Sequence, residues 1–166
     1  MYQFFFNQTD EDAIKYIKIF TFLTKEEITE IEKEHLANLG QRVGQKRLAY
    51  EVTKIIHGKE KADEAVLMSE ALFSGNFKAL NKSQIEELFN SLKFKIDSND
   101  KLEDILIKIK AASSKREARE FVKNGAVTVN GEKITDPNKV FTSEELLADS
   151  FLVIKRGKKN FYLAEF

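Results

Sequence analysis

Apolar residues recur every three or four positions along most of the first 92 residues, with polar residues between them. Near the start of the chain, the residues that share one side at about 100° per residue are Ala13, Ile14, Ile17 and Phe20. This spacing is typical of amphipathic helices that bury one face in a core. We predict five such helices, over residues 11–22, 24–38, 41–57, 61–73 and 83–92.

The residues at the ends of these segments support the boundaries. We expect Asp10 to be the N-cap of the first helix, and we expect capping boxes at Thr24–Glu27 and Ser83–Glu86. Gly40 and Gly58 are expected to end the second and third helices, because glycine adopts the left-handed conformation that often follows a helix.

The same periodicity predicts which side chains are buried. In the second helix the expected inward residues are Ile28, Ile31 and Leu39. In the third helix they are Leu48, Val52, Ile55 and Ile56. In the fourth helix they are Ala65, Met68, Ala71 and Leu72.

The pattern changes after residue 92. Residues 93–101 are polar and rich in turn formers, and we interpret them as a linker. Beyond them we predict helices over residues 102–109 and 115–123. Asn130-Gly131 is a strong hairpin-turn signal. The four strands that we predict are residues 126–129, 132–134, 151–155 and 160–165.

These elements predict an α+β protein with two domains. Residues 1–92 would form a small all-helical bundle, and residues 93–101 would form the linker. Residues 102–166 would form an α+β domain in which a short helix leads into a β-hairpin.

Composition excludes several classes of function. The 166 residues include no cysteine, so disulfides, thiolate catalysis and cysteine metal sites are absent. The two histidines, His35 and His57, are far apart in sequence, and we expect no metal site. No apolar run approaches the length of a membrane span, and the N-terminus lacks a basic leader. We therefore expect a cytoplasmic protein with no membrane partner.

Charge is distributed unevenly although the net charge is zero. Lys and Arg number 14 against 17 Asp and Glu in residues 1–100, and 13 against 10 in residues 101–166. The helix predicted over residues 115–123 opens with a capping box, Ser114–Glu117, and ends before Gly125. Four cations share an arc of roughly 100° on this helix: Lys115, Arg116, Arg119 and Lys123.

A second basic cluster surrounds the predicted turn at Gly157. Its members are Lys155, Arg156, Lys158 and Lys159. Like charges at a hairpin tip repel one another and do nothing for folding. A solvated helix face and a role in solubility remain open for the two clusters. Two clusters that converge on one surface would suit a phosphate backbone, and that convergence is what an RNA-binding interpretation requires.

The stretch from Ser114 to Gly131 also resembles a known RNA-binding motif. The helix–hairpin (alpha-L) motif named for ribosomal small-subunit protein S-four places a helix with basic residues before a hairpin. The matching residues are Ser114, Lys115, Ala118, Arg119, Gly125, Val127, Val129, Asn130 and Gly131.

The resemblance extends to bacterial tyrosyl-tRNA synthetases over residues 1–78 and 102–166. The segment MYQFFFNQTDEDAIKYIKIFTFLTKEEI is similar to the start of their helical anticodon-recognition domain, and IKRGKKNFYL to the end of their RNA-binding domain. The nucleotide-binding motifs of their Rossmann-like catalytic domain do not occur here. The chain thus resembles the C-terminal half of such an enzyme, a class I ligase, and we expect no catalytic residues and no enzymatic activity from it alone.

The resemblance implies that the chain binds tRNA-Tyr in support of aminoacylation. The helical domain would face the anticodon stem-loop, and the second domain would bind the anticodon stem and the long variable arm. The implied phosphate contacts are Lys115, Arg116, Arg119, Lys123, Lys155, Arg156, Lys158 and Lys159. Asp10 is a weaker expectation as an acceptor for an anticodon base, because an Asp at that position more often caps the helix.

The resemblance also implies that ATP and Mg²⁺ belong to the catalytic domain, so we expect no cofactor in this chain. Family members dimerise through that domain, and we expect a monomer here. Two other functions remain open from the residues. One is a free-standing RNA-binding regulator or ribosome-associated protein, and the other is a helical module that binds acidic proteins through its basic clusters.

Overall fold

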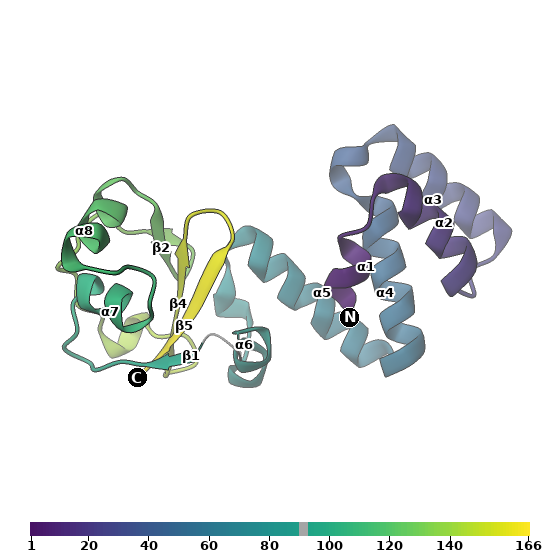
Figure 1. The fold of residues 1–166 in the computed structure, drawn as a ribbon. Helices are drawn as coiled ribbons and strands as arrows, with labels where there is room; N and C mark the ends of the chain where they lie inside the picture. Colours follow the sequence, from purple (N-terminus) through teal and green to yellow (C-terminus); the bar gives the residue numbers. More distant parts are fainter. Residues whose placement is uncertain (90–92) are drawn as a thin grey trace. The chain divides into compact units, whose positions relative to one another are not determined.

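The chain forms two compact units with different kinds of core. The computed structural model describes residues 1–89 and 93–166, and its contacts group residues Met1–Ser69 into one unit and Glu70–Phe166 into the other (Figure 1). The first unit is helical, whereas the second combines helices with a five-stranded sheet. The predicted α+β class is therefore confirmed.

The first unit is built around α4 (Val43–His57). Its other elements are α1 (Tyr2–Phe6), α2 (Asp10–Phe20), α3 (Lys25–Ala37), η1 (Leu39–Gln41) and the first part of α5 (Lys59–Ser74). Ile17 of α2 and Leu48 of α4 are completely buried and belong to the same hydrophobic cluster. Tyr2 and Phe6 of α1 pack with Ala49 in a second cluster. The short helix α1 is an element that the sequence analysis did not predict.

Several predicted inward positions in this unit are wrong. Leu48 and Val52 are buried, but Ile55 and Ile56 are 42% and 56% exposed. The last turn of α4 extends past the core, and periodicity does not reveal where a partner surface ends. Leu39 is also exposed, because α3 ends at Ala37 and Leu39 begins the 3-10 turn η1.

Local capping was predicted well in some places and wrongly in others. The Thr24–Glu27 box is present, and Gly58 follows α4 at φ +88°. The N-cap of α2 is Thr9, whose Oγ1 accepts the Asp12 N–H, so Asp10 is the first helical residue instead. Gly40 does not end α3, since the C-cap is Asn38.

The start of α6 (Lys82–Phe89) also differs from the prediction. The reciprocal bonds that the sequence analysis assigned to Ser83–Glu86 are made two residues earlier. The Asn81 Oδ1 accepts the Gln84 N–H, and the Gln84 Oε1 accepts the Asn81 N–H, each at 3.0 Å. Asn and Gln form the same two bonds as Ser and Glu, so the motif is present with other residue types. The predicted end of this helix, near residue 92, lies outside the described residues.

The second unit is organised around a mixed sheet with the strand order β1-β5-β4-β2-β3. The strands are β1 (Lys93–Lys95), β2 (Val127–Val129), β3 (Glu132–Lys133), β4 (Phe151–Arg156) and β5 (Asn160–Glu165). The β1–β5 pair is parallel, and the other neighbouring strands are antiparallel. The central β4–β5 hairpin runs from Phe151 opposite Glu165 to Arg156 opposite Asn160, as the predicted strands require.

Helices cover both faces of this sheet (Figure 1). On one face, α7 (Leu102–Lys108) and α8 (Lys115–Lys123) pack on Leu152 and Ile154. On the other face, the Phe161 ring lies 5.8 Å from the Phe89 ring of α6. Successive side chains of a strand point to opposite faces, so each residue of β4 belongs to one of these two layers.

The hairpin turn between β2 and β3 agrees with the prediction. Asn130 and Gly131 have φ of +51° and +86°, the two positive values that a type I′ turn needs. The turn packs against Gly75, just after α5, and a Cβ on Gly131 would overlap the Gly75 carbonyl oxygen. Two glycines therefore allow the backbone of the turn to touch the backbone at the end of α5.

The predicted linker contains a strand of the sheet. Lys93 lies opposite Leu163 and Lys95 opposite Glu165, so β1 extends the sheet on the outer side of β5. Ile96 is buried in the same core as α7 and α8. The compact units meet at residues 69 and 70, within α5, rather than at residue 92. The functional division at residues 93–101 stays a prediction.

Candidate nucleic-acid interface

The helix α8 presents its basic stripe beside the sheet. Its Ala118 and Val122 are buried, whereas the four predicted cations of the stripe are exposed. The Ser114 Oγ accepts the Glu117 N–H, as the predicted N-cap requires. The Glu117 carboxylate does not return to Ser114 and accepts the N–H and Oγ–H of Ser113, both at 2.6 Å. These bonds hold the pKa of Glu117 below its ordinary value.

Two acidic residues of α7 neutralise half of the stripe. Glu103 is only 2% exposed, and Arg119 donates to both of its carboxylate oxygens, through Nε at 2.5 Å and Nη2 at 3.1 Å. Lys115 Nζ lies 2.7 Å from Asp104 and 3.7 Å from Glu103. The hydrogen bond from Arg119 is the main reason why the pKa of Glu103 is lowered, and Lys115 adds to it. Arg119 and Lys115 therefore hold α8 against α7.

The other two cations of the stripe differ. Within the described residues, Arg116 and Lys123 have no ion-pair or hydrogen-bond partner. Both are exposed and remain available to an external anion.

The hairpin tip does not form one cluster, because β4 directs its two cations to opposite faces. Arg156 lies on the α8 side, where its Nη1 donates to the Ala111 carbonyl oxygen at 2.5 Å and its guanidinium stacks over the Phe121 ring. Lys155 lies on the α6 side, with its Nζ 5.1 Å from the centre of the Phe161 ring. Lys158 and Lys159 are exposed in the turn between the strands.

The tip nevertheless approaches the end of α8. The Gly157 N–H donates to the Ala126 carbonyl oxygen at 2.8 Å, which joins the turn between β4 and β5 to the loop that follows α8. The backbone of the tip therefore lies beside the loop that follows Lys123, and the convergence of the two clusters stays a prediction for Lys123, Lys158 and Lys159. It does not extend to Lys155, which the alternation of β4 places on the other side of the sheet.

Sequence reasoning overlooked Lys133. This residue of β3 has no partner among the described residues, and its side chain lies across Gly125 at the C-terminal end of α8. The sequence analysis counted it only as part of a strand. Its position two residues after the Asn130-Gly131 turn was the available signal, because that turn returns the chain to the end of α8.

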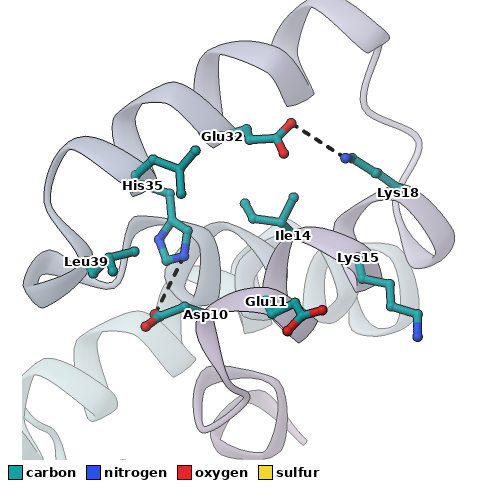
Figure 2. A pocket seen from close by; sticks show the side chains of 9 residues that line it. Asp10, Glu11, Ile14, Lys15, Lys18, Glu32, His35 and Leu39 are labelled. Carbon is teal, nitrogen blue, oxygen red and sulfur yellow. Dashed lines mark ion pairs between the residues drawn. The ribbon is translucent and has the colours of Figure 1, made fainter.

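The remaining predicted residue, Asp10, borders a pocket in the first unit (Figure 2). The pocket has a volume of about 500 Å³ and lies between α2 and α3. The Asp10 Oδ1 accepts from Gln45 Nε2 at 2.7 Å and faces His35 Nε2 at 3.5 Å. His35 is buried, and its Nδ1 accepts the Gly44 N–H, so Nε2 carries the proton that faces Asp10.

Other kinds of site are not found in the described part of the chain. No group of three or more His, Asp or Glu side chains there is placed to hold a metal ion. No helix there combines the length and the apolar character that crossing a bilayer requires.

Comparisons with known proteins divide the chain between two family models. Residues 84–164 match the tyrosine–tRNA ligase SYY-like C-terminal domain, and residues 1–74 match class I tRNA synthetases for tryptophan and tyrosine. A tyrosine–tRNA ligase of Oceanobacillus iheyensis is 44% identical over an alignment that covers 99% of this chain. The chain belongs to the tyrosyl-tRNA synthetase family.

Other tyrosyl-tRNA synthetases agree with this assignment. Tyrosine–tRNA ligase 1 of Bacillus subtilis is 41% identical over 99% of this chain. The chain spans about two fifths of the length of these relatives, 39% for the Oceanobacillus protein and 40% for the Bacillus protein. The solution structure of a tyrosyl-tRNA synthetase C-terminal domain is 36% identical and covers 57% of this chain and 98% of its own, with a TM-score of 0.43. That score is too low to support the fold, so the family assignment rests on the sequence matches.

Proposed function

We propose that this chain binds tRNA-Tyr and thereby supports aminoacylation by a tyrosine–tRNA ligase. The observation that supports the proposal is a group of cations, at one end of the second unit's sheet, that have no partner in residues 1–89 and 93–166. Lys123, Lys158 and Lys159 border the contact between Gly157 and Ala126, and Arg116 lies on the same helix as Lys123. Unpaired lysines and arginines that gather on one surface are suited to a phosphate backbone.

The eight predicted contacts then have different roles. Arg116, Lys123, Lys158 and Lys159 would bind phosphates directly. Lys115 and Arg119 would act partly through the structure, because Asp104 and Glu103 already bind them. Arg156 and Lys155 would mainly hold the base of the tip in place, through Ala111 and Phe161 respectively.

Asp10 is the proposed contact with an anticodon base. Gln45 and His35 both approach its Oδ1, which leaves Oδ2 for an N–H of a base that enters the pocket. Single-stranded loops expose the edges of their bases to such acceptors. The Asp10 side chain is 48% exposed, so a ligand can reach it.

The proposal assigns ATP, Mg²⁺ and the ligase reaction to a catalytic domain outside this sequence. It also includes a monomeric state for this chain and a cytoplasmic location. Light scattering at micromolar concentration tests the monomeric state, and a mass of two chains would contradict it.

Filter binding with three RNAs tests the proposed function. We expect a tRNA-Tyr transcript to bind more tightly than the same transcript without its variable arm, and both to bind more tightly than an unrelated tRNA. Equal binding of all three would favour a general RNA-binding protein. Binding to none would remove the proposal.

A matched pair of variants tests the assigned contacts. Lys158→Gln with Lys159→Gln removes two unpaired cations and should weaken binding by well over tenfold at 0.1 M salt, since each phosphate contact is worth roughly sixfold there. Lys25→Gln with Lys33→Gln makes the same change of charge on α3 in the first unit and should have a much smaller effect. Equal losses from both pairs would contradict the assignment.

A further inference from the structure

Lys133 is held at the loop that follows α8 by the absence of a side chain on Gly125. A Cβ on Gly125 would overlap the Cε and Nζ atoms of Lys133. Gly125 follows α8 with φ of +66°, so a glycine is favoured there for two reasons. It adopts the left-handed conformation, and it leaves room for the Lys133 side chain. The ammonium group of Lys133 therefore lies beside residues 124–126.

Three further lysines that have no partner among the described residues border the same loop. Lys123 is the last residue of α8, and the Gly157 N–H bonds to Ala126 at the far side of the loop. Lys158 and Lys159 continue from Gly157. Figure 1 shows the turn between β4 and β5 at the same end of the sheet as the chain that enters β2.

No carboxylate balances Lys133 within the sheet. Its partner on β2 is Thr128, and the next residue in that row is Lys155 on β4, so Lys133 starts on the same face of the sheet as Lys155. β3 is the edge strand, and the Lys133 side chain reaches the loop around Gly125 beyond that edge. Glu132 precedes Lys133 on β3, and the alternation of side chains directs it to the opposite face. Thr128 thus has one lysine on each side, Lys133 and Lys155, and this row contains no pair of opposite charges that would stabilise the folded chain.

We propose that Lys133 is a further RNA-binding residue, and that it joins Lys123, Lys158 and Lys159 in binding one stretch of phosphate backbone around residues 124–126. The inference rests on the proposed function and adds a contact to it. Its structural alternative is that the Lys133 ammonium only interacts with the C-terminal dipole of α8.

Salt titration of tRNA-Tyr binding by the whole chain separates the two roles. We expect Lys133→Gln to reduce the slope of log K against log salt by about 0.7–0.9, and to weaken binding about sixfold at 0.1 M salt. Lys133→Arg should keep the wild-type slope. The control is Lys95→Gln, which removes the same charge at the opposite end of the sheet, where Lys95 lies opposite Glu165.

Thermal melting of each variant completes the experiment. An unchanged slope in Lys133→Gln with a lower melting temperature would assign the residue to the α8 dipole and overturn the inference, while the proposed function would stand. An equal slope change in Lys95→Gln would also overturn it, because the effect would then report total charge. If the wild-type chain binds no RNA, both the inference and the proposed function fail.

Discussion

At the scale of single residues, a lysine or arginine can bind an external phosphate only if no acidic side chain of the chain already binds it. Lys115 and Arg119 share the predicted stripe with Arg116 and Lys123, and nothing in residues 115–123 separates the two pairs. The separation comes from α7, where the buried carboxylate of Glu103 receives Arg119. A buried ion pair that loses one partner leaves an uncompensated charge, so Arg119 is a structural residue as well as a possible ligand of RNA.

The first prediction compares the two arginines. Arg119→Ala should lower the melting temperature by about 5–10 °C, because the buried Glu103 then loses both hydrogen bonds from Arg119 and keeps the weaker contact with Lys115 at 3.7 Å. Arg116→Ala should change it by no more than about 2 °C, since Arg116 is exposed and unpaired. Calorimetry measures both. If Arg119→Ala and Arg116→Ala have the same melting temperature, the ion pair between Arg119 and Glu103 contributes little to stability, and Arg119 is available to bind RNA.

The second prediction concerns acid. Arg119 holds the pKa of Glu103 below its ordinary value of 4.5, so the folded state gains stability wherever this carboxyl is ionised in the unfolded chain. That gain is complete above about pH 4.5 and is lost as the pH falls through the lower folded value. Protonated Glu103 resembles glutamine in shape and charge.

The difference in unfolding free energy between wild type and Glu103→Gln should therefore be largest near pH 7 and should shrink towards zero as the pH falls through the lowered pKa of Glu103. Urea unfolding at several pH values measures the difference. The control is Glu144→Gln, because Glu144 is exposed and its substitution should give a small, flat difference. A constant difference for Glu103→Gln over the whole range would show that the lowered pKa contributes no stability.

At the scale of elements, the sequence predicted what is decided locally. The helix of residues 115–123, the Asn130-Gly131 turn and the strands of the β4–β5 hairpin all follow from residues within a few positions of one another. The exposure of Ile55 and Ile56 and the pairing of β1 with β5 depend on surfaces distant in sequence. Periodicity says that a face is apolar but does not say whether another element covers it.

The third prediction belongs to the contact between α5 and the β2–β3 turn. Gly131→Ala should destabilise the second unit by about 2–4 kcal/mol, because the new Cβ meets the Gly75 carbonyl oxygen and alanine disfavours a φ of +86°. Gly157→Ala is the matched control, since Gly157 has φ of +66° and no atom near its missing Cβ. It should cost only about 1 kcal/mol.

Chemical unfolding of both variants measures the difference. Equal losses would mean that the backbone conformation alone is responsible and that the close approach of Gly75 contributes nothing. A larger loss for Gly131→Ala would identify the two glycines as the contact that fixes the end of α5 against the hairpin.

At the scale of the whole molecule, family membership and the charge asymmetry of the chain could be obtained from the sequence, whereas the shape of the interface could not. The residues that carry the resemblance to the RNA-binding motif lie in one short stretch, from Ser114 to Gly131. The proposed convergence of Lys123 with Lys158 and Lys159 depends on the bond between Gly157 and Ala126, which joins segments about thirty residues apart. Lys155 and Arg156 point to opposite faces because side chains alternate along β4, whereas the predicted strand ended at Lys155 and left Arg156 in the turn.

The fourth prediction counts the phosphates that the whole chain neutralises. If all eight predicted cations bound phosphate, log K against log salt would have a slope of about −6 to −7, at 0.7–0.9 per contact. We expect about −3.5 to −4.5, because four of the eight, Arg116, Lys123, Lys158 and Lys159, have no partner among the described residues and Lys133 adds a fifth contact. Titration of tRNA-Tyr binding between 50 and 200 mM salt gives the slope. A value near −7 would mean that RNA displaces Glu103 and Asp104 from Arg119 and Lys115, and a flat response would exclude phosphate binding by these residues. The intermediate slope is expected because the chain retains its internal ion pairs when it binds.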